Sequence, residues 1–272
     1  MSLTGLHPVN PSRPGRPSDE DGEVRNIRTI DLDDRRFRVF SSERVSAGRE
    51  FLLVHGVGIS HRLFSRLHGV LSAEHSVHTL DLPGFGGLPK PASDPDVEAM
   101  AADLGRVLDR LQIGPVVAIG DSMGTQWVVE LAAQRPDLVS HVVAIGPVAD
   151  SRHRSLLEQA TALGLDSLRE PPSANARVLV EYARCGPRWY AQQVRHMLDY
   201  PIEKRVSELS VPLLVLRGGR DPIAGPEWSR DVARRTARGR FVQVAGHPHL
   251  VQHTAPEPVA REIEAFLEAE PM

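Results

Sequence analysis

Short apolar runs alternate with helix-period segments along most of this sequence, and this alternation constrains the fold more than any other feature. Six runs predict strands buried on both faces, because they are apolar without alternation: residues 51–55, 77–80, 116–119, 142–145, 212–216 and 241–244. Helices are predicted at residues 97–111, 122–134, 227–235 and 258–267. Right-handed crossovers between such units produce a mainly parallel α/β sheet covered by helices on both faces.

Three regions depart from this rhythm. Charged and apolar residues alternate around Asp33 and Asp34, which predicts two short antiparallel strands at a sheet edge within residues 27–40. Residues 149–210 contain no clear strand, and their helical pieces are broken at Pro171–Pro172 and Pro187, which predicts a helical cap. We expect a core of residues 26–148 and 211–272, and a disordered, proline-rich leader in residues 1–25.

Composition excludes several classes of partner. A net charge of −3 over 272 residues gives no broad positive field, so we expect no nucleic-acid partner. No apolar run approaches the roughly 20 residues that span a bilayer, and no signal peptide is expected. Cys185 is the single cysteine and cannot form an internal disulfide, so a cytoplasmic location is the default. No feature indicates a cofactor or an oligomeric state.

The segment Gly120-Asp121-Ser122-Met123-Gly124 follows a predicted strand and opens a predicted helix. A serine hydroxyl is a poor nucleophile unless a sharp turn holds it clear of the backbone, and flanking glycines make room for such a turn. The helix N-terminus also directs backbone N–H groups towards developing negative charge. Ser122 is therefore the candidate nucleophile.

This segment resembles the nucleophile turn of the α/β-hydrolases, and the resemblance extends from about residue 27 to 267. His55-Gly56 is similar to the oxyanion-loop motif of that family, and the run from Asp81 to Gly86 resembles its turn after the next strand. The resemblance implies an α/β-hydrolase fold with a helical cap. It also implies that the backbone N–H groups of Val57 and Met123 form the oxyanion hole. His55 and Asp81 are expected to hold loops in place.

A serine nucleophile of this family needs a histidine base and a carboxylate that orients it. The segment from Arg217 to Ile223 resembles the acid loop of the family, so Asp221 is the predicted acid, with Asp150 in reserve.

The base must come from the tract after the last strand, which holds His247, His249 and His253. Gly246-His247 looks like the Gly-His pair of the family, yet the resemblance favours His249 on two other points. Relatives have a turn of this length before the base, and they often have a proline seven residues after it, where this chain has Pro256. Pro248 replaces the usual glycine of that turn. No cysteine or acidic residue lies in the tract, so we predict no metal site.

Several further side chains of the cap and the core have roles outside the triad or more than one role open to them. Tyr182, Trp189 and Tyr190 either line a substrate pocket or simply pack, whereas Trp127 and Cys185 are expected to be buried. Four cap arginines either face solvent or meet a substrate carboxylate: Arg154, Arg177, Arg184 and Arg188.

The resemblance favours an esterase-like serine hydrolase that cleaves a carboxylic ester or a related acyl bond of a small molecule through an acyl-enzyme. Carbon–carbon hydrolases and perhydrolases of the family keep a serine triad, so both stay open. A ligand receptor without turnover is an alternative of another class. Epoxide hydrolases and haloalkane dehalogenases are disfavoured, because they place an aspartate where this chain has Ser122.

Overall fold

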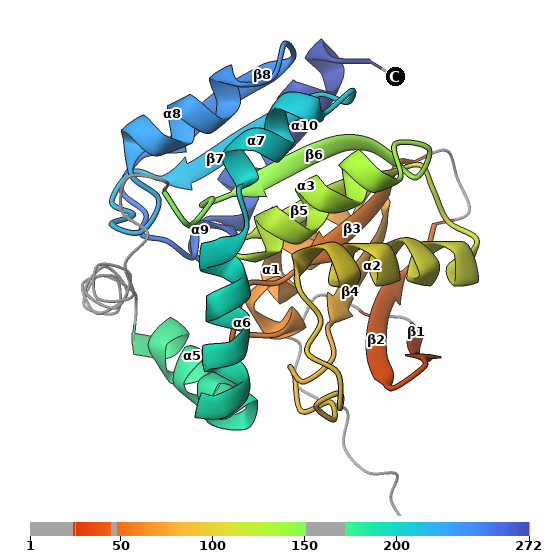
Figure 1. Cartoon of the computed structure of the whole chain (residues 1–272). Helices are drawn as coiled ribbons and strands as arrows, with labels where there is room; N and C mark the ends of the chain where they lie inside the picture. Colours follow the sequence, from red (N-terminus) through yellow and green to blue (C-terminus); the bar gives the residue numbers. More distant parts are fainter. Residues whose placement is uncertain (1–23, 25, 45–47, 151–171, 272) are drawn as a thin grey trace, which may run out of the picture.

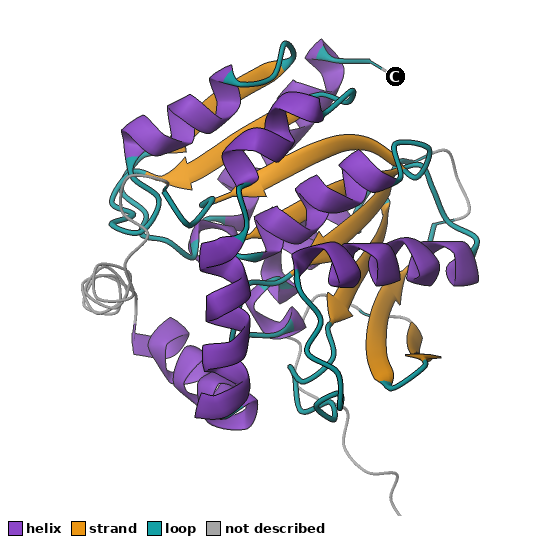
Figure 2. Cartoon of the chain, in the orientation of Figure 1, coloured by secondary structure: helices purple, strands orange, loops and turns teal. Residues whose placement is uncertain are grey.

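A mixed sheet of eight strands runs through the part of the chain that the computed structural model describes, which is residues 24, 26–44, 48–150 and 172–271 (Figures 1 and 2). The sheet order is β1-β2-β4-β3-β5-β6-β7-β8. The strands are β1 (Asn26–Leu32), β2 (Arg35–Ser42), β3 (Glu50–Val54), β4 (Ser76–Asp81), β5 (Val116–Asp121), β6 (Val139–Ile145), β7 (Leu213–Gly218) and β8 (Gly239–Val244). The expected leader and residues 151–171 of the expected cap lie outside the described residues, apart from Val24.

The first two strands form the antiparallel edge that the sequence predicts. β1 pairs with β2 through a turn in which Asp33 has a φ of 56°, and β2 pairs antiparallel with β4. All further pairings are parallel. The carboxyl ends of these parallel strands therefore meet at one edge of the sheet, where ligands bind in open α/β sheets.

Helices cover both faces of the sheet (Figure 1). One face packs against α2 (Val97–Leu111), α3 (Gly124–Gln134) and α8 (Pro226–Arg234), and the other against α1 (Ser65–Leu71), α9 (Val251–Thr254) and α10 (Pro256–Ala269). The side chains of β3, β5, β6 and β7 alternate between these two apolar layers, which is why their runs are apolar without interruption.

The described part of the expected cap is helical. It consists of α5 (Pro172–Cys185), α6 (Pro187–Asp199), α7 (Ile202–Arg205) and the short η2 (Val206–Glu208). The two long helices meet at Gly186, which has a φ of 74°, and Pro187 then opens α6, as the sequence predicts. These helices lie beside the carboxyl edge of the sheet in Figure 1.

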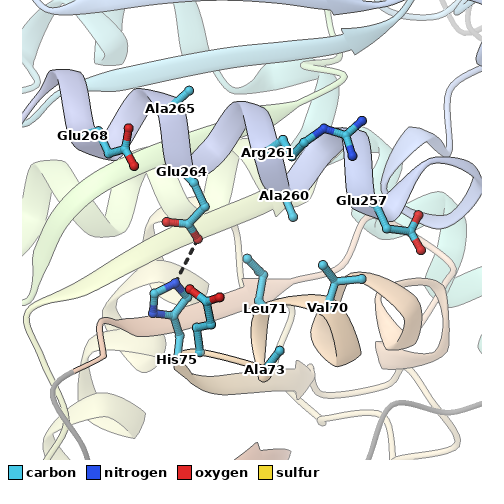
Figure 3. Close-up of a pocket in the computed structure, with 11 residues that line it drawn as sticks. Val70, Leu71, Ala73, His75, Glu257, Ala260, Arg261, Glu264, Ala265 and Glu268 are labelled. Atoms are coloured by element: carbon cyan, nitrogen blue, oxygen red, sulfur yellow. Dashed lines mark hydrogen bonds and ion pairs between the residues drawn. The ribbon is translucent and has the colours of Figure 1, made fainter.

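A pocket of about 450 Å³ lies between α1 and α10 (Figure 3). Its floor is apolar, and the His75 Nε2 atom lies 2.9 Å from Glu264 Oε1 at one end. None of the predicted site residues lines this pocket.

Candidate active site

Ser122 lies in a tight turn between β5 and α3. Its φ is +55°, in the left-handed region that non-glycine residues rarely adopt, and its N–H donates to the Ile145 carbonyl at 2.9 Å. A Cβ at Gly120 would lie 2.3 Å from the Gly124 oxygen, and one at Gly124 would lie 2.3 Å from the Val54 oxygen. Both glycines are therefore required for this turn.

The loop of residues 56–60, here called the oxyanion loop, passes directly beside Ser122. A Cβ at Gly56 would lie 2.9 Å from Ser122 Cβ and 3.4 Å from Ser122 Oγ. Val57 follows Gly56, and Met123 follows Ser122 as the N-cap of α3. The two predicted oxyanion donors thus belong to the two backbone segments that flank the serine.

His55 holds the base of the oxyanion loop. Its ring is fully buried, Nε2 accepts from the Leu82 N–H at 3.2 Å, and Nδ1 donates to the Gly56 carbonyl at 2.7 Å. Burial lowers the pKa of His55, which favours this neutral tautomer. The contacts are those expected of a residue that holds a loop.

Asp81 also has the contacts of a structural residue. Its Oδ1 accepts from the His61 N–H at 2.9 Å and from His61 Nδ1 at 2.8 Å, and Oδ2 lies 3.3 Å from Arg38 Nη1. Burial alone would raise the pKa of Asp81, but the hydrogen bonds and charge of His61 outweigh it and hold that pKa below its ordinary value.

Asp221 and His249 are paired after β7 and β8. The imidazole Nδ1 lies 2.8 Å from Asp221 Oδ2, and both side chains are buried. The other carboxylate oxygen, Oδ1, accepts from the N–H groups of Ile223 at 2.8 Å and Ala224 at 2.9 Å. Asp221 is thus held by its own loop in the orientation that meets the imidazole.

Gly146 joins this pair to the serine turn. A Cβ on Gly146 would lie 2.8 Å from His249 Cε1, so the imidazole rests against the bare α-carbon. The preceding residue, Ile145, accepts the Ser122 N–H. The serine turn and the imidazole therefore flank the same end of β6.

The second candidate base has a different partner. His247 Nδ1 lies 3.2 Å from Thr254 Oγ1, and the His247 carbonyl accepts the Arg220 N–H at 2.8 Å. The reserve acid Asp150 is half buried, at the last described residue before the gap.

Comparison with known proteins identifies the fold. The model of the alpha/beta hydrolase fold family matches residues 51–170. The crystal structure of the enol-lactonase from Burkholderia xenovorans LB400 superposes with a TM-score of 0.76 at 19% identity, covering 89% of this chain and 100% of that chain. The chain has the α/β-hydrolase fold.

Two curated relatives are similar at low identity. The (E)-2-((N-methylformamido)methylene)succinate hydrolase of Acinetobacter baylyi is 24% identical over 262 residues, which cover 90% of this chain and 99% of the relative. The pimeloyl-[acyl-carrier protein] methyl ester esterase of Neisseria meningitidis is 26% identical over 242 residues, which cover 76% of this chain and 73% of the relative. The similarity to the first relative thus extends over most of both chains.

Cap aromatics lie close to the site of this α/β-hydrolase fold. The rings of Tyr182 and Tyr190 pack on Gly58 of the oxyanion loop, and Trp189 packs on Gly84 and Phe85. Trp127 and Cys185 are buried, as expected.

The four cap arginines have different surroundings. Arg184 pairs with Glu181 at 2.8 Å, Arg188 is exposed, Arg177 is partly buried, and Arg154 lies outside the described residues.

Two important residues of the site were not predicted from the sequence. Arg217 is buried and donates to the carbonyls of Ala224 and Asp221, each at 2.7 Å, so it braces the acid loop. A glycine is required at position 146, because a Cβ there would lie 2.8 Å from His249 Cε1. A signal existed for each: Arg217 ends an otherwise apolar strand, and Gly146 directly follows one.

The described residues offer neither a metal cluster nor a membrane-spanning helix. No cluster of three or more His, Cys, Asp or Glu residues suited to a metal ion occurs among them. Within the same residues, no helix is both long and apolar enough to cross a bilayer.

Proposed function

We propose that this protein is a serine hydrolase that cleaves a carboxylic ester or a related acyl bond of a small molecule through an acyl-enzyme. The observation that carries the proposal is the 2.8 Å pairing of His249 Nδ1 with the buried Asp221 carboxylate, beside the strained turn of Ser122. A nucleophile, an orienting carboxylate and a base, in this order along the chain, are the parts of a serine triad.

Each group has a defined task in the proposed mechanism. Ser122 Oγ attacks the acyl carbon while His249 Nε2 takes the serine proton, and Asp221 stabilises the imidazolium. The backbone N–H groups of Val57 and Met123 stabilise the negative charge on the substrate oxygen. His249 then protonates the leaving group, and the same imidazole activates the water that releases the acid and frees Ser122.

The acid–base chemistry depends on the tautomer of His249. An ionised Asp221 accepts a hydrogen bond from Nδ1, so the proton stays on Nδ1 and Nε2 is the atom that accepts the serine proton. Arg217 donates a hydrogen bond to the Asp221 carbonyl, and this contact limits the movement of the loop that carries the acid. Hydrogen bonds that fix a loop keep the catalytic side chain on it in its productive orientation.

Two curated relatives support a hydrolase that acts on a small acyl compound. One is named as a hydrolase of (E)-2-((N-methylformamido)methylene)succinate and the other as a methyl ester esterase. In this proposal the cap is the segment of residues 149–210, and the aromatic side chains of its described helices α5 and α6 lie over the acyl group of the substrate. A cytoplasmic location is part of the same proposal and follows from the cysteine usage.

A substrate panel tests the proposal. The panel holds p-nitrophenyl esters of increasing acyl length, enol-lactones, amidomethylene succinates and vinylogous diketones, each assayed with the wild type and with Ser122→Ala. We expect hydrolysis of at least one ester, lactone or amide by the wild type and none by the variant. Cleavage of diketones alone would indicate a carbon–carbon hydrolase. Tight ligand binding without turnover or serine labelling would indicate a receptor.

A further inference from the structure

We infer that the cap helix α5 holds the oxyanion loop in its active position, and that Glu181 is a positioning residue that acts through Arg62. This inference rests on the proposed function, because it concerns the loop that carries Val57. It assigns to the cap a role in stabilising the transition state, in addition to covering the substrate.

An ion pair joins α5 to the segment that directly follows the oxyanion loop. Glu181 of α5 is only 2% exposed, and its Oε1 lies 3.1 Å from Arg62 Nη1. Arg62 belongs to η1 (His61–Leu63), and Ser60, the last residue of the oxyanion loop, is the N-cap of η1 and accepts the Arg62 N–H. The ion pair therefore connects the cap to the end of the loop.

Glu181 is buried, so its ion pair with Arg62 is shielded from solvent on the carboxylate side. Its Oε2 is buried and accepts no hydrogen bond from any residue in the described part of the chain. The charge is compensated at Oε1 by Arg62 and, within α5 itself, by Arg184 at 2.8 Å. Burying a carboxylate costs free energy unless a cation pairs with it. The folded state therefore favours the position of Arg62 in which its guanidinium contacts Glu181.

Two tyrosine rings press on the middle of the oxyanion loop. Gly58 has a φ of +78°, and a Cβ there would lie 2.6 Å from Tyr182 Cε1 and 2.9 Å from Tyr190 Cδ2. The two rings also contact one another, with centroids 5.2 Å apart. Gly58 directly follows Val57, so the rings restrict the backbone next to the proposed oxyanion donor.

An apolar cluster completes the contact between α5 and the loop. Ile59 and Leu63 pack with Ala174 of α5 and with Leu250, the residue after His249, and Val178 packs against the same cluster. The oxyanion loop is thus fixed by His55 at its start and by contacts with α5 along its remaining residues. The same cluster brings α5 against the segment that carries the proposed base.

This arrangement predicts which kinetic constant depends on Glu181. A backbone N–H stabilises an oxyanion only when it is already fixed at the right distance, so a looser loop loses stabilisation mainly in the transition state. Disrupting the pair should lower kcat more than it raises KM. Binding of uncharged, substrate-like ligands should change little.

Arg62→Met and Arg184→Met form a matched pair for the test. Both variants remove one guanidinium from Glu181 Oε1, but only Arg62 connects α5 to the oxyanion loop. We expect Arg62→Met to lower kcat by about tenfold, a fraction of the loss seen when an oxyanion donor is removed, with KM nearly unchanged. Arg184→Met should stay within about twofold of the wild type.

A charged transition-state analogue separates positioning from general loosening. An arylboronic acid bound to Ser122 carries the negative charge that the oxyanion hole recognises, so its affinity should fall in parallel with kcat in Arg62→Met. Glu181→Gln should reproduce the split between kcat and KM, and the double variant should be no worse than Arg62→Met alone. The fold of each variant is checked by its melting temperature.

The outcomes also separate this inference from the proposed function. A wild type that is labelled by a fluorophosphonate, with equal activity in Arg62→Met and Arg184→Met, would overturn the inference alone. A wild type with neither labelling nor turnover would refute the proposed function and, with it, the inference. A parallel loss of kcat and substrate affinity in Arg62→Met would show a purely structural role.

Discussion

At the scale of single residues, the two oxygens of Asp221 have different partners. Oδ1 accepts two backbone N–H groups, from Ile223 and Ala224, while Oδ2 meets His249 Nδ1. An asparagine at this position would have to place its carbonyl oxygen at the Oδ1 position, because only an acceptor suits those two donors. Its amide nitrogen would then face His249 Nδ1.

Asp221→Asn should therefore lower kcat by about 10⁴-fold, as in another serine triad where the wrong histidine tautomer results. The loss arises because Nδ1 must become the acceptor and the proton moves to Nε2. Steady-state kinetics measure the effect, and the melting temperature should change little. Asp150→Asn is the control and should keep near-normal activity; a dead Asp150→Asn with an active Asp221→Asn would contradict the acid assignment.

The two nearby histidines are distinguished by their partners. His249→Ala should reduce kcat by at least about 10⁴-fold, since the nucleophile loses its base. His247→Ala removes only a 3.2 Å contact with Thr254, so its activity should stay within a few-fold of the wild type. The comparison is made with the same ester at the same pH. If His247→Ala were inactive and His249→Ala active, the base would be His247.

At the scale of elements, the helix that follows Ser122 is joined to the end of the cap by a buried carboxylate. Glu130 of α3 accepts from Tyr200 Oη at 2.7 Å, from Arg205 Nε at 2.7 Å and Nη2 at 2.8 Å, and from Gln134 Nε2 at 2.9 Å. Burial alone would raise the pKa of Glu130, but the hydrogen bonds from Arg205 and Tyr200 outweigh it and lower that pKa.

Glu130→Gln should reduce the free energy of unfolding by about 3 kcal/mol, because Arg205 loses its buried ion-pair partner. Glu208→Gln is the matched control: Glu208 also pairs with Arg205, but its side chain is 54% exposed, so the loss should stay below about 0.5 kcal/mol. Urea denaturation measures both. Equal losses in the two variants would show that the buried position of Glu130 has no special weight.

Helix α1 carries a buried histidine that makes stability depend on pH. His68 lies between two strands, with Nε2 2.9 Å from Ser42 Oγ and Nδ1 2.7 Å from Thr79 Oγ1. Burial, together with the nearby His78 and His61, lowers the pKa of His68 from 6.5 to about 4. Between these values the unfolded chain binds a proton that the folded chain does not.

The His68 contribution should therefore reduce the free energy of unfolding as pH falls from about 6.5 to 4, by about 3 kcal/mol in total. In His68→Gln this part of the pH dependence should disappear, whatever the absolute stability of the variant. Urea midpoints at several pH values between 7 and 4 measure the slope. An unchanged slope in His68→Gln would assign the acid sensitivity to other groups, such as His253, whose pKa burial also lowers to about 4.

At the scale of the whole molecule, the strand pattern accounts for where the candidate site residues lie in the sheet. Ser122, Asp221 and His249 each follow a strand of the parallel part of the sheet, and the carboxyl ends of such strands meet at one edge. Their proximity therefore follows from the strand pattern. The position of β2 beside β4 does not, because the antiparallel edge carries no crossover that would fix its order.

Contacts between cap and core are the part that the sequence pattern misses. Arg62 and Glu181 are 119 positions apart, and no local periodicity links a short 3-10 helix to a cap helix. Each looks like an ordinary surface charge until α5 is packed against Ile59 and Leu63. Such pairs depend on the placement of whole elements rather than on local propensity.

The measurement that tests the central claim most directly is the site of fluorophosphonate modification, mapped by tandem mass spectrometry. A fluorophosphonate reacts with a serine only when a base activates it, so the adduct reports nucleophilicity rather than fold. We expect a single adduct per chain on Ser122, absent in Ser122→Ala and formed far more slowly in His249→Ala. Catalytic turnover by a wild type that forms no adduct, or an adduct on another residue, would contradict it.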